Sequence, residues 1–275
     1  MPANDFCFFS FCSTLVAIHY NDFVDAGIVE QLVSLNREFY QSFSVSFSST
    51  RYQVQPGVRK VAKRFPQNGN LLDIGCGNGN LMQVLQQKGF RGTYTGVDFS
   101  ENLIQESQKA FVLLGIQATF QAHFSVFDLM SSDWQTLPIR KEWDVICAFA
   151  VFHHIPGKDN RKRIFYNIHS ILNPKSDFVF SVWQPQNSKR LVKRYQPWST
   201  IGLLDTEVEE GDVLMDWKAE QAQDTRIGLR YVHVFTRGEL REIAQECGFL
   251  IKDEFYSDGK EGNVGLYQVW QMKPG

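Results

Sequence analysis

Apolar side chains near the start of the chain recur at helical spacing. The positions that share this spacing are Leu32, Leu35, Phe39, Phe43, Val58, Val61 and Phe65. A repeat of three or four residues places side chains on one face of a helix. Pro56 and Gly57 separate two runs of this repeat. Residues 28–66 are therefore predicted to form two helical pieces.

From residue 70 onward, short apolar runs alternate with amphipathic stretches. Predicted strands cover residues 71–74, 93–97, either 118–120 or 124–127, 144–149, 177–182 and 265–272. Predicted helices cover residues 80–87, 100–115, 160–172 and 236–248, the second of which begins at Ser100, a good N-cap. This alternation is typical of βαβ units. The predicted fold is α/β, a doubly wound, mostly parallel, Rossmann-like sheet of seven strands with helices on both faces.

Residues 184–230 lack this alternation, and a basic part of the segment is followed by an acidic part. Four basic residues lie within 189–194, and six acidic residues follow within 205–216. Such an excursion is more typical of an insertion that caps the strand ends than of an independent domain. The chain is accordingly divided into an N-terminal extension (1–27) and one domain (28–275), made of a helical cap (28–69), a core (70–183), the insertion (184–230) and a C-terminal helix and strand (231–275).

Composition and charge add limits to this prediction. The chain has 275 residues, 43% of them hydrophobic and 21% charged, which excludes a disordered or fibrous protein. Its net charge of -2 gives no overall attraction to a polyanion. Thirteen of the 28 basic residues nevertheless fall within 51–64, 158–163 and 189–194. A basic run is usually a solvated face, so these stretches indicate a nucleic-acid surface only if they converge around one cleft.

The five cysteines are widely scattered and form no CxxC pair. They favour a reducing compartment, here the cytoplasm, over a disulfide framework. The apolar run 6–18 has no Lys or Arg before Arg37, so it is predicted to be a packing or poorly ordered extension rather than a targeting segment. The run is also too short to span a membrane, and no membrane partner is expected.

The most specific local pattern is the segment 71–80, LLDIGCGNGN, in which a predicted strand enters a glycine loop and then a helix. Glycines let the backbone turn sharply and approach a ligand at a helix N-terminus. The third glycine comes one residue early for a dinucleotide fingerprint, which disfavours an oxidoreductase. A pyrophosphate would be repelled by Asp73, whereas an ammonium group, such as that of S-adenosylmethionine, would be attracted.

Acidic residues also end the next two predicted strands. Asp98 is placed where a carboxylate accepts hydrogen bonds from ribose hydroxyls, and Asp128 is placed to meet an adenine amino group. Across residues 70–183 the sequence resembles the class I S-adenosylmethionine-dependent methyltransferases. The cofactor contacts that this resemblance implies are Asp73, Gly75, Gly77, Asp98 and Asp128, and we expect Tyr40, Phe99 and Leu129 to join them.

Two histidines follow the predicted strand 144–149. A histidine there could orient or deprotonate a methyl acceptor, and we assign this role to His154, while at least one of His153 and His154 is expected to be structural. No metal site is predicted, because adjacent histidines without a third ligand do not form one.

An acceptor that is already a carboxylate needs positioning cations and aromatic walls rather than a base. The candidates are Arg51, Arg230, Tyr231, His233 and Trp217, each of which could equally be a packed or solvated residue. Among them, Arg51 and His233 are predicted to be needed for methyl transfer but not for cofactor binding.

A closer resemblance extends beyond the core. The motifs that carry it are Tyr40 followed after six residues by FSSTR (47–51), AVFHH (150–154), VW (182–183), DVLMDW (212–217) and RYVHVFTRGEL (230–240). In this order they are similar to the tRNA wobble-uridine carboxymethyl methyltransferases, which esterify a carboxymethyl group on the anticodon uridine. The resemblance implies tRNA as the partner, and some family members also work with a small zinc-binding activator protein. Asp216 departs from the family, which has a proline there.

Two other hypotheses remain open. The first is a class I methyltransferase that acts on a small-molecule acceptor, with the same cofactor loop under a different cap. The second is a binding module that keeps the cofactor pocket without turnover. The complete set of predicted cofactor residues makes this second alternative the weaker one.

Overall fold

The computed structural model describes residues 24–50, 53–130, 134, 137, 143–218 and 227–274, with only the backbone described for residues 44–50. Arg51 and the apolar run 6–18 lie outside this part of the chain. Among the described residues, no helix is both long enough and apolar enough to cross a membrane.

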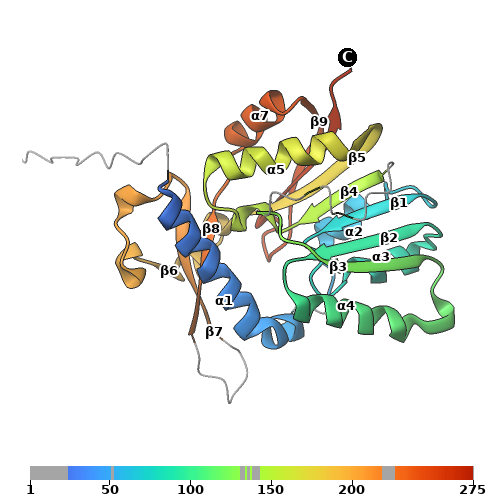
Figure 1. The fold of residues 1–275 in the computed structure, drawn as a ribbon, viewed down its shortest axis with the longest axis horizontal. Helices are drawn as coiled ribbons and strands as arrows, with labels where there is room; N and C mark the ends of the chain where they lie inside the picture. Colours follow the sequence, from blue (N-terminus) through green and yellow to red (C-terminus); the bar gives the residue numbers. More distant parts are fainter. Residues whose placement is uncertain are drawn as a thin grey trace, which may run out of the picture.

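A seven-stranded sheet forms the centre of the molecule, in the order β3-β2-β1-β4-β5-β10-β9 (Figure 1). The strands are β1 (Asn70–Ile74), β2 (Thr93–Asp98), β3 (Gln121–Val126), β4 (Trp143–Phe149), β5 (Leu172–Trp183), β9 (Phe249–Ser257) and β10 (Gly265–Met272). β1 to β5 run parallel, and β10 runs antiparallel to both of its neighbours. The predicted α/β class and the mostly parallel sheet are confirmed.

Helices cover both faces of this sheet, because successive side chains on a buried strand point to opposite sides. Leu71 of β1 packs with α2 (Pro56–Ala62), α3 (Leu81–Lys88) and α4 (Glu101–Leu114). Leu72, the next residue, packs on the other face with α5 (Lys158–Ile171) and α7 (Arg237–Glu246). The predicted N-cap is present: the Ser100 hydroxyl accepts a hydrogen bond from the Leu103 amide.

A smaller antiparallel sheet stands beside the central one. Its order is β6-β7-β8, from β6 (Tyr195–Gln196), β7 (Asp212–Lys218) and β8 (Ile227–His233). Helix α1 (Ala26–Thr50) packs against β8, and we call α1 and this sheet together the cap (Figure 1). The predicted insertion 184–230 thus contains a sheet that its irregular pattern did not predict, and β8 runs three residues beyond its boundary.

Asn36 joins α1 to β8. Its side-chain amide donates to the carbonyl of Tyr231 (3.2 Å), and its carbonyl oxygen accepts from the Tyr231 amide (2.8 Å). β8 is an edge strand of the small sheet. Unpaired backbone groups at such an edge cost free energy when they are buried. One buried side chain therefore takes the place of a neighbouring strand and aligns α1 with β8.

Replacing Asn36 with leucine should lower the free energy of unfolding by about 1–3 kcal/mol, because the buried N–H of Tyr231 loses its partner and the Tyr231 carbonyl keeps only its contact with His154. Urea denaturation measures this change. Gln31→Leu on the same helix is the matched control, since exposed Gln31 bonds the carbonyl of Ile201 and its loss should cost less than about 0.5 kcal/mol. Equal effects of the two substitutions would contradict the account of Asn36.

Candidate active site

The carboxyl ends of β1, β2, β4 and β5 open into a cavity of about 480 Å³, to which α1 and β8 also contribute. All eight residues predicted to contact the cofactor line it, together with His154. They are Tyr40, Asp73, Gly75, Gly77, Asp98, Phe99, Asp128 and Leu129. Residues far apart in the sequence meet here because parallel strands present their carboxyl ends at one edge of the sheet.

The glycine loop requires its glycines for two different reasons. Both Gly75 (φ 67°) and Gly77 (φ 56°) have left-handed backbone, which other residues rarely adopt. A Cβ on Gly75 would lie 2.4 Å from a methyl group of Val151, whereas a Cβ on Gly77 would meet no atom within 4 Å. The loop is tied to β2, since the amides of Gly75 and Cys76 both donate to the carbonyl of Val97. Gly75 is therefore packed tightly against the protein, whereas Gly77 faces open space in which a ligand can approach the backbone.

Asp73 is a buried carboxyl group at the end of β1. It accepts hydrogen bonds from the Tyr94 hydroxyl (2.7 Å) and the Cys147 thiol (3.5 Å). Burial raises the pKa of Asp73 to about 7, against the lowering effect of these two hydrogen bonds, and the charge of Asp98 adds to the rise. Asp73 therefore titrates near neutral pH, and a cation bound beside it would favour its ionised form.

Asp98 connects the glycine loop to the end of β2. One carboxylate oxygen accepts from the Gly77 amide (3.0 Å) and the other from the Ser100 amide (2.9 Å). Burial raises its pKa against the effect of these backbone hydrogen bonds. A carboxylate offers about four acceptor positions, so capacity for a hydroxyl donor remains.

Asp128 bridges the core and the cap. One carboxylate oxygen accepts from the Met130 amide (2.9 Å), and the other forms an ion pair with Arg37 of α1. Arg37 lines the cavity but was not predicted. The sequence around Arg37 predicted a helix, but nothing in it indicated that Asp128, 91 residues away, would be its partner.

His154 has a defined arrangement of its ring nitrogens. Nδ1 lies 3.1 Å from the carbonyl oxygen of Tyr231, which can only accept, so Nδ1 carries the proton. In the neutral ring Nε2 then accepts from the Tyr40 hydroxyl at 2.7 Å. The neighbouring His153 has a different partner, because its Nδ1 accepts from the Trp183 amide (3.2 Å). His154 thus holds Tyr40 at the cavity, while His153 supports the end of β5.

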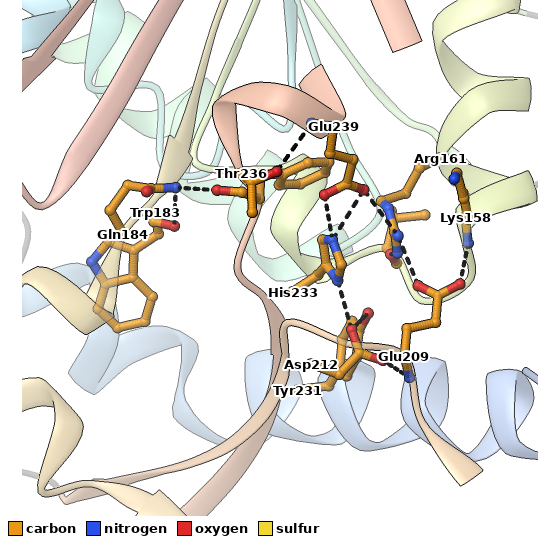
Figure 2. A network of polar contacts seen from close by, with 12 residues as sticks. Lys158, Arg161, Trp183, Gln184, Glu209, Asp212, Tyr231, His233, Thr236 and Glu239 are labelled. Atoms are coloured by element: carbon orange, nitrogen blue, oxygen red, sulfur yellow. Dashed lines mark hydrogen bonds and ion pairs between the residues drawn. The ribbon is translucent and has the colours of Figure 1, made fainter. Parts of the chain in front are cut away.

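His233 lies in a buried polar network rather than in the cavity lining (Figure 2). Its Nδ1 is 2.7 Å from Asp212, and its Nε2 is 3.0 Å from Glu239. Arg161 of α5 binds Glu209 (2.7 Å) and Glu239 (3.2 Å) in the same network. These contacts join the cap to α5 and α7 of the core.

The geometry of β8 explains why Arg230 lines the cavity and His233 does not. Along β8, alternate side chains point to opposite faces of the small sheet. Arg230 lines the cavity, whereas Tyr231 and His233 both reach Asp212 on the other side, the Tyr231 hydroxyl at 2.7 Å. The sequence interpretation grouped Arg230 and His233 in one acceptor wall, because it did not predict a strand at 227–233.

Glu209, Asp212 and His233 lie close enough together to suggest a metal site. Their polar atoms are already bonded within the protein, however, and Arg161 occupies the position beside Glu209 that a cation would take. The chemistry of this donor set therefore fits a structural network better than a metal ion.

Among the described residues of the three basic stretches, most do not line the cavity. Lys162 pairs with Glu246 and Arg161 belongs to the buried network, both on α5, on the opposite face of the sheet from α2. On α2 and just after it, Lys60 lies 3.6 Å over the ring of Phe255 and Arg64 pairs with Asp253. Of the described members of these stretches, Arg190 lines the cavity.

Asp258 is a further cavity residue that the sequence interpretation missed. Its two carboxylate oxygens accept from the Gly57 amide (2.9 Å) and the Tyr267 hydroxyl (2.6 Å), and so hold the start of α2 against β10. The Asp258-Gly259 pair is a turn signal that could have marked this position.

A doubly wound sheet with a glycine loop after β1 and carboxylates at the ends of β1 and β2 defines an α/β enzyme that binds a nucleoside-containing cofactor. The chain belongs to the family of methyltransferase domains, whose model matches residues 47–253. Among solved structures, it is similar to an S-adenosylmethionine-dependent methyltransferase from Methanosarcina mazei, at 22% identity and a TM-score of 0.59, over 81% of this chain and all of that one.

A glycopeptide N-methyltransferase crystallised with S-adenosylmethionine shares the fold, at 12% identity and a TM-score of 0.57, over 80% of this chain and 86% of that one. Among curated relatives, a tRNA (carboxymethyluridine(34)-5-O)-methyltransferase of Schizosaccharomyces pombe is 24% identical over 229 residues, which are 80% of this chain and 90% of that protein. An Arabidopsis thaliana enzyme of the same name is 27% identical over 58% of this chain and 35% of its own length. The protein is thus an S-adenosylmethionine-dependent methyltransferase.

The buried network predicts a pH-dependent stability. Burial and the charge of Arg161 oppose protonation of His233, but its hydrogen bonds to Asp212 and Glu239 outweigh them and raise its pKa above 6.5. A group with a raised folded-state pKa stabilises the fold below its unfolded pKa and loses this effect as the pH rises through the folded pKa.

The difference in unfolding free energy between the wild type and His233→Gln should therefore narrow as the pH increases from about 6 to about 9. Urea titrations at several pH values measure it. Using the difference between the two proteins cancels the titration of groups that they share, such as Asp73. A difference that stays constant over this range would show that His233 is not held as a cation.

Proposed function

We propose that this enzyme methylates the carboxymethyl group of a modified wobble uridine in tRNA. The observation that carries the proposal is the extent of the similarity to the S. pombe enzyme, which covers 80% of this chain. Such coverage includes parts of the cap as well as the cofactor core, and the cap is where an acceptor would be selected. A cytoplasmic location belongs to the same proposal, and the described cysteines Cys76, Cys147 and Cys247 are free thiols.

Cofactor binding is assigned to the ends of β1, β2 and β3. When bound, S-adenosylmethionine supplies a methyl group on a positively charged sulfur. We assign its ammonium group to Asp73, its ribose hydroxyls to Asp98 and its adenine amino group to Asp128. The open space at Gly77 and the buried carboxyl group of Asp73 support this assignment. Phe99, Leu129 and Tyr40 would complete the walls of the pocket.

The methyl acceptor needs no general base if it is a carboxylate, because a carboxyl group with an ordinary pKa near 4 is ionised at neutral pH. The remaining task of the protein is to align the reacting atoms and exclude water. His154 orients the Tyr40 hydroxyl at the cavity. We assign His233 a positioning role, because it acts through β8 rather than at the cavity. Arg51 is retained as a cation that helps to hold the acceptor.

The second candidate is methylation of a small carboxylate metabolite by the same site. The position of the α5 basic stretch on the opposite face from α2 favours it, since a tRNA surface would gain from converging basic stretches. Both candidates share the cofactor contacts and the carboxylate chemistry, and they differ in the size of the acceptor.

Labelled S-adenosylmethionine should transfer its methyl group to tRNA that carries 5-carboxymethyluridine at the wobble position. The product should be a methyl ester, which mild alkali hydrolyses back to the carboxylate. Nucleoside mass spectrometry measures the product, and the same tRNA with an unmodified wobble uridine is the control. A metabolite extract is incubated in parallel, and label that enters the extract but not the tRNA would select the second candidate.

Cofactor affinity should depend on pH through Asp73. The pKa of this carboxyl group is raised to about 7, so it is largely neutral at lower pH and must lose its proton to pair with an ammonium group. Between about pH 7 and pH 5.5, where an α-ammonium group stays charged, affinity should fall by up to about tenfold per unit.

Isothermal titration calorimetry measures this affinity, and Asp73→Asn provides the control. The variant should bind weakly at every pH in the range, since it has no proton to lose. A wild-type affinity that does not change between the two pH values would remove Asp73 from the ammonium site.

A further inference from the structure

Arg230 is a buried cation on the cavity side of β8. Its side chain lines the cavity, and the residue is only 4% exposed. An arginine stays protonated in proteins, and burial of its charge is costly unless polar or anionic groups compensate. Arg230 thus brings a permanent positive charge to the wall of the cavity.

Two aromatic rings hold the guanidinium in place. Its central carbon lies 4.7 Å from the ring centroid of Trp183, at the end of β5, and 5.3 Å from that of Phe39, on α1. Cation–π contacts use the face of a ring, and the N–H donors of a guanidinium lie in its own plane. Rings from β5 and α1 thus hold the Arg230 guanidinium, a planar group that can pair with a carboxylate through two hydrogen bonds.

Apart from Arg37, which pairs with Asp128, the acidic and basic residues of the cavity come from different elements. Asp73 and Asp98 lie at the carboxyl ends of β1 and β2, Asp128 follows β3, and we call this group the acidic end. Arg190 and Arg230 come from the segment after β5 and from the cap, and we call this the basic end. An acidic end suits a cofactor with an ammonium group, whereas a basic end attracts an anionic acceptor and disfavours an amine.

Two nearby acidic residues, Asp258 and Asp216, do not neutralise the positive charge of the basic end. Asp258, the remaining acidic residue of the cavity lining, bonds the Gly57 amide and the Tyr267 hydroxyl. Asp216, which departs from the family pattern, pairs with Leu229 in the small sheet and so lies on the opposite side from Arg230. One of its carboxylate oxygens accepts from the Gln196 side chain (3.2 Å).

We propose that Arg230 binds the carboxylate of the methyl acceptor and is the residue that selects an anionic acceptor over a neutral one. The proposal rests on the function proposed above and names the residue that recognises the reacting group. In the reaction, a carboxylate oxygen forms a bond to the methyl carbon while the bond from that carbon to sulfur breaks and sulfur takes the electron pair. The anion and the sulfonium cation become a neutral ester and a neutral thioether.

This loss of charge has a kinetic consequence. Arg230 attracts the carboxylate before the reaction more strongly than it attracts the ester afterwards, so it favours acceptor binding and product release. An interaction that is no stronger in the transition state than in the bound substrate lowers KM without raising kcat. Arg230→Gln should therefore raise KM for the acceptor at least tenfold and leave kcat within about threefold, a split that general damage to the fold would not produce.

The direct test measures binding of two nucleosides, 5-carboxymethyluridine and its neutral amide, 5-carbamoylmethyluridine, to the enzyme saturated with S-adenosylhomocysteine. The wild type should bind the carboxylate at least tenfold more tightly than the amide, and Arg230→Gln should lose this preference. Arg230→Lys, which keeps the charge but not the planar fork, should keep part of it. Lys193→Gln is the matched control, because it removes one exposed charge that does not line the cavity and should keep the full preference.

Thermal melting and S-adenosylhomocysteine affinity show whether each variant is folded. If Arg230→Gln does not fold, the comparison is made with Arg230→Lys. An unchanged carboxylate preference in the folded Arg230 variants, or equal binding of the two nucleosides by the wild type, would overturn the proposal. Failure of the wild type to methylate the tRNA, together with an Arg230-dependent preference for the carboxylate, would instead overturn the proposed function and leave the carboxylate site standing.

Discussion

The pairing of strand β8 with its surroundings is the constraint on which the acceptor side of this methyltransferase depends. One edge of β8 pairs with β7, and the other is bonded by the side chain of Asn36 from α1. The carbonyl of Tyr231 in the same strand also binds His154, which follows β4 of the core. A single strand therefore aligns the cap helix, the small sheet and the loop that carries His154. Because its side chains alternate, one face of β8 serves the cavity and the other serves the attachment of the cap.

The attachment is made by buried charges rather than by apolar contacts alone. Arg161 and Glu239 come from core helices, Asp212 and His233 come from the cap, and Glu209 lies in the segment just before β7 (Figure 2). Buried ions are tolerated only where each is paired and hydrogen-bonded, so a small rotation of the cap would leave charges without partners. We infer that this network sets the orientation of the basic end of the cavity relative to the glycine loop. Methyl transfer depends on such alignment more than on acid–base groups.

Local patterns in the sequence predicted the elements that carry the proposed cofactor residues. The glycine loop and the strands leading to Asp73 and Asp98 depend on short-range signals, and the structure has these elements at the predicted places. β8 and β9 were not predicted. β9 is an edge strand whose sequence, FLIKDEFYS, mixes charged and apolar residues on both faces. β8 pairs with the preceding strand β7, but Asn36 and His154, which also bond it, are distant in the chain. The roles of Arg230 and His233 differ only through that strand, so their separation could not be read from the sequence alone.

Although the protein is nearly neutral, its cavity has an acidic end and a basic end. Lys60 and Arg64 of the α2 stretch and Arg161 and Lys162 of the α5 stretch are engaged by nearby acidic or aromatic groups, while Arg230 is held at the cavity by two rings. The central claim is that alternation of side chains along β8 directs Arg230 toward the methyl acceptor and His233 into the network that attaches the cap. A crystal structure with S-adenosylhomocysteine and 5-carboxymethyluridine tests it most directly. The account predicts the nucleoside carboxylate on the Arg230 guanidinium, with His233 still bonded to Asp212 and Glu239. A carboxylate bound to His233, or a nucleoside bound away from Arg230, would contradict it.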